Sequence, residues 1–446
     1  MKARNLSTAV LLLSVFFLSV LACSLTNTIM ESSEEDIPEP ASETDETGET
    51  EEVEEADVSY LSSDVIMVSN TTTYLDKSGI WKIHGLITNT ANTSVGLIKL
   101  EAVLSDGSLS DPVFAAPTGL APGETIPFRI GLPLSVTLVD QFEVQVIRVQ
   151  QASMEPAQLE VVSTSLHEAE NGIVTLSGEI SNPSGSGADL NTLEAALFDE
   201  NGDLITSAAC QVCPRSIPSG GQVPVQFLFY GHPVEQEIAS QEVYISSVVN
   251  PGLETFDAAV LEPVHSYKDE ASWVHVLGQV RNDSEAILDL TLLATLYDSE
   301  GQVAAADRTN PSIRSLNPGE SSPFEFRFLD TGIQIEDWQI QVDPRLTRIV
   351  ETPSFELAAE GEQVTPAEFQ WTFTGSVVNE TEETLEVVLI VAGVRDPSTG
   401  KLAGLAQELR MGEVPSGSSI DYSITVTTDT GIDQAGLEAF TILRGR

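Results

Sequence analysis

Short stretches in which apolar and polar residues alternate recur along the chain, and Gly, Pro, Asn and Asp separate them. In residues 174–180 every second residue is apolar or Gly, and residues 81–87 and 371–377 repeat this spacing. A period of two places these residues on one face of a β-strand, and no helical period accompanies it. We therefore expect short strands joined by turns along most of the chain.

A Gly-x-x-x-Asn pattern occurs four times in these stretches, at intervals of 93, 100 and 97 residues. Self-similarity at a nearly fixed period indicates one small domain used repeatedly. The Gly lies inside a predicted strand, where a missing side chain marks a bulge or close packing by a neighbour, and the Asn ends that strand with turn chemistry. The repeat landmarks are Gly85 and Asn89, Gly178 and Asn182, Gly278 and Asn282, and Gly375 and Asn379.

Two further features follow each Gly at a similar distance. An Asp comes 20 or 21 residues later, and a Pro-Gly or Pro-Ser-Gly turn follows the Asp. We expect the Asp to fix a hairpin turn by accepting backbone N–H groups. The positions are Asp106, Asp199, Asp298 and Asp396, with turns at Pro122-Gly123, Pro218-Ser219-Gly220, Pro318-Gly319 and Pro415-Ser416-Gly417.

About seven short strands per 90 to 100 residues are typical of an immunoglobulin-like sandwich. The predicted fold class is therefore all-β, with four tandem immunoglobulin-like β-sandwich domains. Pro and polar residues set the expected domain limits at 59–150, 157–250, 256–347 and 354–446. The linkers between them are short, which favours a stiff string of domains.

The N-terminal 22 residues have the composition of an export signal. Lys2 and Arg4 precede an apolar run over residues 6–22, which is short for a membrane span. Val20-Leu21-Ala22-Cys23 resembles the lipobox of bacterial lipoproteins, and this resemblance implies that Cys23 carries a lipid. The alternative is an ordinary secretory signal in which the Cys is incidental.

The segment after the signal is strongly acidic. Residues 31–58 hold 14 Asp or Glu and no Lys or Arg, so we expect a disordered linker over residues 23–58. The whole chain has a formal net charge of −48, which makes nucleic acid and anionic lipid surfaces poor partners.

The residues before the recurring Asp suggest a family. Leu296-Tyr297-Asp298, and next Leu197-Phe198-Asp199, resemble the signature of the FxLYD domain, an immunoglobulin-like module of bacterial envelope proteins. Ala replaces the leading Phe of that signature in every repeat. The resemblance covers residues 59–446, and it implies a fold and an envelope location but no catalytic residues.

Cys210 and Cys213 form a Cys-x-x-Cys pair in the second repeat alone. Such a pair can be redox-active, half of a zinc site or a structural disulfide. Redox function expects the start of a helix, and zinc needs two further ligands, for which His232 is the sole nearby candidate. In an oxidising compartment we expect the structural disulfide.

No other residues form a recognisable catalytic or metal-binding motif. The five histidines lack zinc or catalytic spacing, and we expect His84 and His275 at solvent-facing strand positions. The loop after Asp199 lacks the Gly and Glu of a calcium loop. Trp81, Trp371 and Trp338 read as core or interface residues, and Trp273 is the best candidate for an exposed aromatic side chain.

These observations predict a non-enzymatic, membrane-anchored extracytoplasmic lipoprotein, with no cofactor and no metal site. It would form a structural or interaction rod of the bacterial cell envelope, with the membrane, envelope proteins or surface polymers as partners. The alternative is a ligand-binding module for a glycan or a divalent cation. A hydrolase would require a pocket with a paired nucleophile and base, which the sequence does not indicate.

Overall fold

The computed structural model describes residues 59–76, 78–115, 119–137, 139–168, 172–230, 237–269, 271–329, 335–347 and 355–446. All of them belong to one compact unit, Val58–Arg446. Their regular structure is β-strand, with two short 3-10 helices, η2 (Ser63–Val65) and η3 (Gln434–Gly436), and no α-helix among the described residues. The predicted signal segment, Cys23 and the acidic linker lie outside the described residues.

The strands form four consecutive groups, and in the first group two antiparallel sheets share one apolar core. One sheet has the order β2-β3-β6 and the other the order β1-β7-β4-β5. The strands are β1 (Tyr60–Leu61), β2 (Ile66–Leu75), β3 (Trp81–Asn89), β4 (Val95–Leu104), β5 (Val113–Ala115), β6 (Thr125–Gly131) and β7 (Phe142–Gln151).

The second group joins its two layers into one sheet with the order β12-β10-β11-β13-β9-β8, because β11 pairs with both β10 and β13. Strand β14 pairs with the other side of β10. The strands are β8 (Glu160–Glu168), β9 (Val174–Ser181), β10 (Gly187–Phe198), β11 (Leu204–Val212), β12 (Ser216–Ile217), β13 (Gln222–Phe229) and β14 (Ser240–Asn250).

The third group again has two sheets. Strands β15-β16-β20 form one, and β18-β17-β19 form the other, with β21 paired to β17. The strands are β15 (Ala258–Lys268), β16 (Trp273–Asn282), β17 (Leu288–Tyr297), β18 (Val303–Thr309), β19 (Ser315–Leu316), β20 (Ser321–Leu329) and β21 (Asp337–Leu346).

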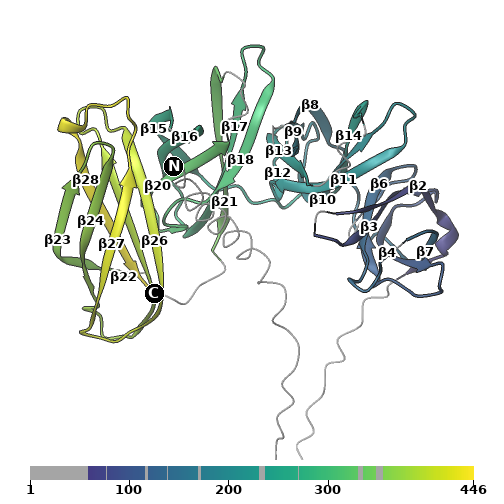
Figure 1. Cartoon of the computed structure of the whole chain (residues 1–446), viewed down its shortest axis with the longest axis horizontal. Helices are drawn as coiled ribbons and strands as arrows, with labels where there is room; N and C mark the ends of the chain where they lie inside the picture. The colour runs from purple at the N-terminus through teal and green to yellow at the C-terminus, as the bar shows by residue number, and fades with distance from the viewer. Residues whose placement is uncertain are drawn as a thin grey trace, which may run out of the picture. The chain divides into compact units, whose positions relative to one another are not determined.

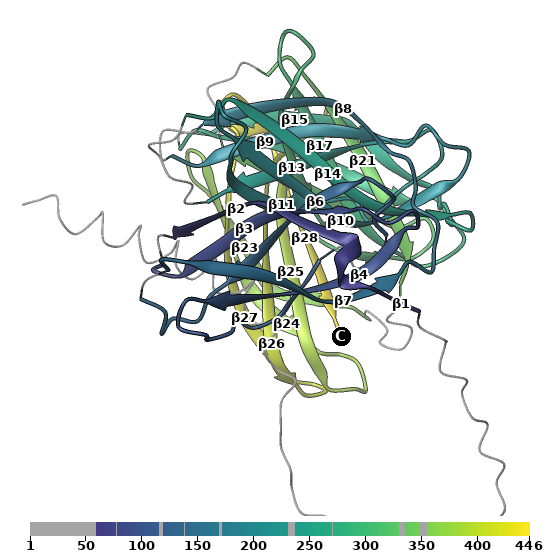
Figure 2. The same ribbon diagram turned by 90° about the vertical axis from the view of Figure 1, so that its right-hand side faces the viewer.

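The fourth group repeats this plan with the sheets β23-β24-β27 and β22-β28-β25-β26. Strands β24 and β27 lie next to each other in both views (Figures 1 and 2), as their pairing requires. The strands are β22 (Phe355–Glu356), β23 (Ala358–Pro366), β24 (Gln370–Val378), β25 (Leu385–Arg395), β26 (Leu402–Val414), β27 (Ser419–Thr427) and β28 (Glu438–Gly445).

Alternation of apolar and polar residues explains why these segments form two-layered sheets. In β4, Ile98, Leu100 and Ala102 are fully buried, whereas the residues between them are partly exposed. Successive strand residues point to opposite faces, so each such strand contributes one apolar row to the space between two layers. The predicted all-β class with serial antiparallel sandwiches is therefore confirmed.

Buried apolar contacts also join neighbouring strand groups. Side chains of one group complete an apolar cluster that belongs mainly to the preceding group, so the cores are not closed within single groups. The residues concerned are Ala196, Phe198, Leu204 and Tyr244 of the second group on the first, Val212 with Leu293 and Ala306 between second and third, and Leu389 and Ile442 of the fourth group on the third.

Candidate functional site

The four recurring Asn residues are fully buried and hold two turns of each repeat together. The amide nitrogen of Asn282 donates to the carbonyl oxygens of Ala286 at 2.7 Å and Leu316 at 2.9 Å. Its side-chain oxygen accepts the N–H of Ser284 at 2.9 Å, and its backbone carbonyl accepts the N–H of Gly319 at 2.8 Å. Equivalent bonds surround the Asn of every repeat, which gives it a structural role.

The recurring Gly lies beneath a side chain of the neighbouring strand. A Cβ added at Gly278 would come within 2.6 Å of the Phe324 ring, and one at Gly85 within 2.6 Å of Phe128. Gly178 departs from this arrangement, because there the added Cβ would meet the Ser163 carbonyl oxygen at 2.5 Å. The strand beside each Gly also contains a bulge. Both expected features of the Gly positions are therefore present.

The recurring Asp fixes its turn as predicted. The Asp199 carboxylate accepts the N–H groups of Asn201 and Asp203, each at 2.9 Å. In the last repeat, hydrogen bonds from Ser398 and Thr399 lower the pKa of Asp396 to about 2. Among the described residues, no group of three or more His, Cys, Asp or Glu side chains is placed to hold a metal ion.

A disulfide joins Cys210 and Cys213, and their Cα atoms are 5.7 Å apart. Cys210 lies on β11 opposite Phe227 of β13, at the point where this sheet passes from one layer to the other. The disulfide therefore constrains the C-terminal end of β11, the strand that connects the two layers of the second group. Cys23 and His232 fall outside the described residues.

The expectation that His84 and His275 face solvent is wrong. His84 is 1% exposed and His275 is 8% exposed. His84 lies on β3 on the face away from its own core, yet the second strand group covers that face. His84 Nδ1 accepts the backbone N–H of Ser207 at 3.1 Å and lies 3.0 Å from the Ser207 hydroxyl. The second strand group therefore buries His84, although the alternation of β3 alone places His84 on the outer face of its own sandwich.

His84 and Ser207 have the residue types of a base and a nucleophile, but their geometry serves a structural contact. Since a backbone N–H can only donate, Nδ1 of His84 is an unprotonated acceptor that is already in use. Burial, and then the charges of Arg129 and Lys82, lower the pKa of His84 to about 3. A group with so low a pKa is a weak general base near neutral pH. The pair therefore ties two strand groups together.

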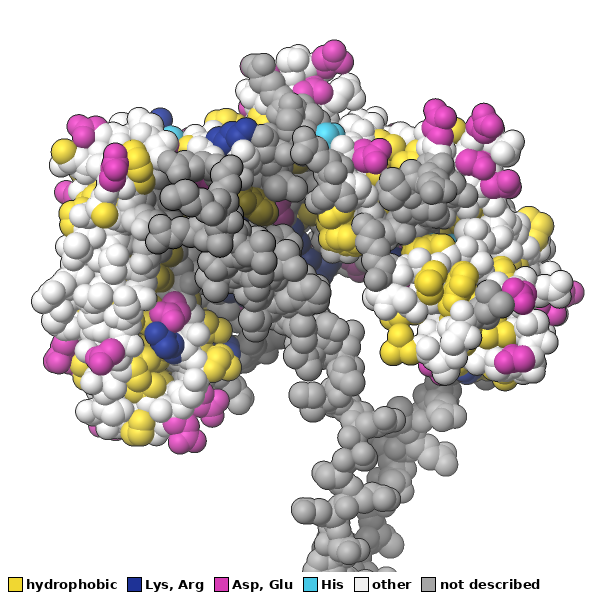
Figure 3. All heavy atoms as spheres, viewed as in Figure 1, with side chains coloured by type: hydrophobic (Ala, Val, Ile, Leu, Met, Phe, Trp, Pro, Cys, Tyr) yellow, Lys and Arg dark blue, Asp and Glu magenta, His cyan; other side chains and the backbone are white. Residues whose placement is uncertain are grey.

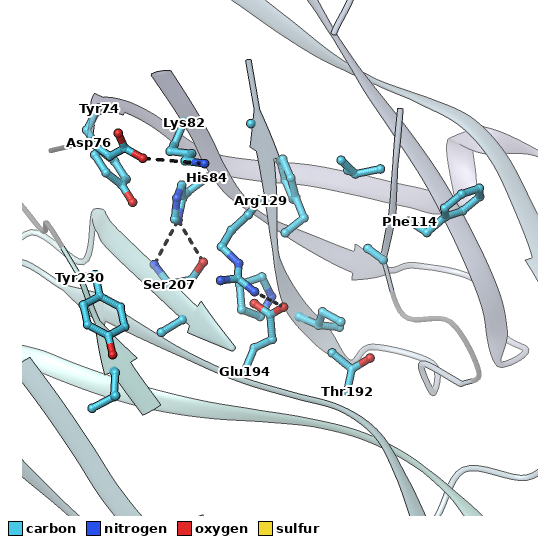
Figure 4. Close-up of a pocket in the computed structure, with 18 residues that line it drawn as sticks. Tyr74, Asp76, Lys82, His84, Phe114, Arg129, Thr192, Glu194, Ser207 and Tyr230 are labelled. Carbon is cyan, nitrogen blue, oxygen red and sulfur yellow. Dashed lines mark hydrogen bonds and ion pairs between the residues drawn. The ribbon is translucent and has the colours of Figure 1, made fainter. Parts of the chain in front are cut away.

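A cleft of about 590 Å³ surrounds this contact, and both the first and the second strand groups line it. Figure 4 shows the two ion pairs in its lining. Arg129 and Glu194 are 3.1 Å apart across the two groups, and Lys82 and Asp76 are 3.8 Å apart. Glu194 Oε2 is buried and lacks a hydrogen-bond partner within the described residues.

A second polar cluster lies where the third and fourth strand groups meet. His265 Nε2 is 2.8 Å from a carboxylate oxygen of Asp429, and the His275 ring stacks on Tyr267 with centroids 4.6 Å apart. Both nitrogens of His275 meet carboxylates, Glu325 at 2.8 Å and Asp269 at 3.1 Å. Burial acts to lower the pKa of His275, but these hydrogen bonds outweigh it and the pKa is raised.

A larger cavity of about 1040 Å³ is lined by the second and third strand groups. Arg308 interacts electrostatically with Arg215, Arg314, Arg345 and Asp343 of this lining, and burial followed by the charge of Arg215 lowers the pKa of Arg308. Within the described residues, neither Arg215, Arg308 nor Arg314 has an ion-pair partner. The charged lining residues are of both signs: Asp189, Arg215, Glu254, Asp289, Arg314, Asp343 and Arg345.

Three of the four tryptophans lie in or against an apolar core, as expected. Trp371 is buried, and Trp81 and Trp338 pack against the cores of their groups. Trp273 is half-buried and lines neither cavity, so the best sequence candidate for an exposed aromatic side chain is not exposed. The exposed aromatic side chains in the cleft are Phe114 and Tyr230 instead. Sequence reasoning missed both, because the cleft is assembled from separate repeats.

Acidic side chains are scattered over the face drawn in Figure 3 and outnumber the basic ones there, in line with the net charge. No segment of the described chain forms a helix with the length and apolarity that crossing a bilayer requires. Neither the protein-family models nor the curated proteins contain a match to this chain.

Proposed function

We propose that this chain is a non-enzymatic lipoprotein of a bacterial cell envelope, held at the membrane through Cys23. Its tandem sandwiches would present surfaces to envelope proteins or surface polymers. The observation that carries the proposal is the coupling of neighbouring strand groups by buried contacts, which suits a structural or interaction rod.

Polar contacts between groups support the same conclusion. The Tyr297 hydroxyl donates to Glu179 at 2.7 Å between the third and second groups. Arg444 of the fourth group donates to Glu320 of the third at 2.5 Å, and their side chains are 14% and 17% exposed. Partly buried pairs of this kind hold neighbouring domains in one arrangement better than exposed pairs do.

The proposed anchor and family rest on sequence features. The tetrapeptide ending at Cys23 resembles a lipobox, and the acidic segment after it is suited to a spacer between an anchor and a folded region. Leu296-Tyr297-Asp298, at the end of β17, supports kinship with FxLYD domains, whose envelope location agrees with an export signal.

The test is mass spectrometry of membrane and medium fractions from cells that make the wild-type chain or Cys23→Ala. We expect a diacylglyceryl mass on Cys23 and release of the variant into the medium. The matched control carries Cys210→Ala and Cys213→Ala together, since it removes the cysteines of the folded region without leaving an unpaired thiol and should keep the wild-type distribution. An unmodified wild-type protein free in the medium would rule out the anchor.

A further inference from the structure

The cleft between the first and second strand groups has features of a ligand site that do not depend on the proposed membrane anchor. Its volume of about 590 Å³ lies within the range of about 300–1,000 Å³ that is common for ligand pockets. Residues of β2, β3, β5 and β6 meet residues of β10, β11 and the end of β13 in its lining.

Exposed aromatic side chains are concentrated in this cleft. Phe114 and Tyr230 are each 59% exposed, and the other exposed aromatic residue of the described chain, Tyr60, lies elsewhere. Figure 4 shows Tyr230 and Phe114 toward opposite ends, with Arg129 and Glu194 between them. Lys99 Nζ lies over the Phe114 ring, 5.7 Å from its centroid. An aromatic face that stays in solvent is a binding surface for flat apolar faces, such as the C–H face of a pyranose ring.

The polar centre of the cleft offers an unused acceptor. Oε1 of Glu194 accepts from Arg129 at 3.1 Å, while the buried Oε2 lacks a partner within the described residues. A buried acceptor without a donor is unfavourable, and a ligand hydroxyl at this position would satisfy it. Thr192 and Tyr74 add hydroxyl groups to the same lining.

The charges of the lining select against an ionic ligand. Asp76 and Glu194 oppose Lys82 and Arg129, so the four side chains sum to zero, and His84 is neutral. The rest of the chain is strongly acidic, with a formal net charge of −48. A balanced cleft on an acidic protein gives neither an anion nor a cation a local advantage.

We propose that this cleft binds an uncharged, polyhydroxylated ligand, namely a segment of a neutral glycan. Sugar rings would stack on Tyr230 and Phe114, and a sugar hydroxyl would donate to Glu194 Oε2. Arg129 would be held by Glu194 so that its remaining N–H groups can donate to sugar oxygens.

Isothermal titration of the full-length protein in detergent with soluble hexasaccharides tests this proposal. The neutral probes are the β-1,4-linked hexamers of glucose and of N-acetylglucosamine and the α-linked hexamer of mannose, and hexagalacturonate is the charged comparison. We expect at least one neutral hexamer to bind and Tyr230→Ala to weaken it about tenfold or more. Tyr60→Ala, which removes an exposed aromatic side chain outside the cleft, should bind as the wild type does.

Glu194→Gln tests the carboxylate acceptor separately from the aromatic side chains, and it should also weaken binding of the neutral hexamer. The proposal is overturned if none of the neutral hexamers binds at about 10 mM. It is equally overturned if Tyr230→Ala and Phe114→Ala bind as tightly as the wild type, or if hexagalacturonate binds best. Because Tyr230 is exposed, the Tyr230→Ala protein should fold. Lipidation at Cys23 is measured in a separate experiment, so failure of one proposal is distinguishable from failure of the other.

Discussion

Acidification should loosen the contact between the first and second strand groups through His84. In the folded protein, burial and then the charges of Arg129 and Lys82 lower the pKa of His84 to about 3, whereas its unperturbed value is 6.5. Once the contact opens, the ring regains that ordinary pKa and takes up a proton. The stability that the neutral ring provides is therefore complete above pH 6.5, and it declines as the pH falls from there toward the folded pKa.

The size of the effect follows from these two values. At pH 5, when the contact is open and the pKa of His84 is roughly 6.5, the protonated ring outnumbers the neutral ring about 30-fold. In the closed form the ring stays neutral. The opening equilibrium should thus rise about 30-fold between pH 8 and pH 5, which corresponds to ~2 kcal/mol.

Hydrogen exchange of the Ser207 amide measures this opening, because that N–H donates to His84 Nδ1 at 3.1 Å. After correction for intrinsic exchange, its protection should fall about 30-fold from pH 8 to pH 5. The amide of Phe373, in the core of the fourth group, controls for the general change in net charge. His84→Gln keeps an acceptor but cannot titrate, so it should remove the pH dependence. The burial argument is refuted if the protection of the Ser207 amide changes with pH as that of the Phe373 amide does. It is also refuted if His84 in the folded protein titrates near its ordinary pKa.

Three substitutions test other parts of the structure. Asn282→Ala leaves buried carbonyl groups without a donor and should lower the free energy of unfolding by about 2–4 kcal/mol in urea titrations. Gly278→Ala forces the Phe324 ring to move and should cost about 1–3 kcal/mol, part of which Phe324→Leu in the same chain restores. Arg308→Gln removes a partly desolvated charge and its repulsion from Arg215, Arg314 and Arg345, which together outweigh its attraction to Asp343, so it should raise the melting temperature slightly. The part of the gain that comes from repulsion should shrink near about 1 M salt.

Each of these expectations has a contradicting outcome. An unchanged urea midpoint for Asn282→Ala would mean that water replaces the lost amide. A Gly278→Ala chain as stable as the wild type would show that the strand spacing relaxes freely. A melting temperature that falls in Arg308→Gln at low salt would show that the attraction to Asp343 outweighs burial and repulsion.

Features that depend on neighbours in the sequence could be predicted, and features that depend on distant strands could not. The alternation of apolar residues gave the strands, and the turn at Asp199 follows from the tendency of Asp to bind nearby N–H groups. The burial of His84 depends on which group covers β3, so strand alternation alone placed it in solvent. The ion pair of Arg129 with Glu194 joins two repeats, and no sequence pattern within either repeat indicates it.

The buried Asn of each repeat also has a consequence for folding. Its amide reaches a backbone carbonyl 31 to 35 residues later, so closing that loop costs nearly the same entropy in all four repeats. Because the partner is always a carbonyl, the bond itself cannot distinguish its own turn from the equivalent turn of another repeat. Tandem domains with interchangeable contacts are prone to misassembly during synthesis. The contact at the recurring Gly is a Phe ring in the first and third repeats, the Ser163 carbonyl in the second and the Tyr422 ring in the fourth. This difference disfavours mispairing between repeats whose Gly contacts are unlike.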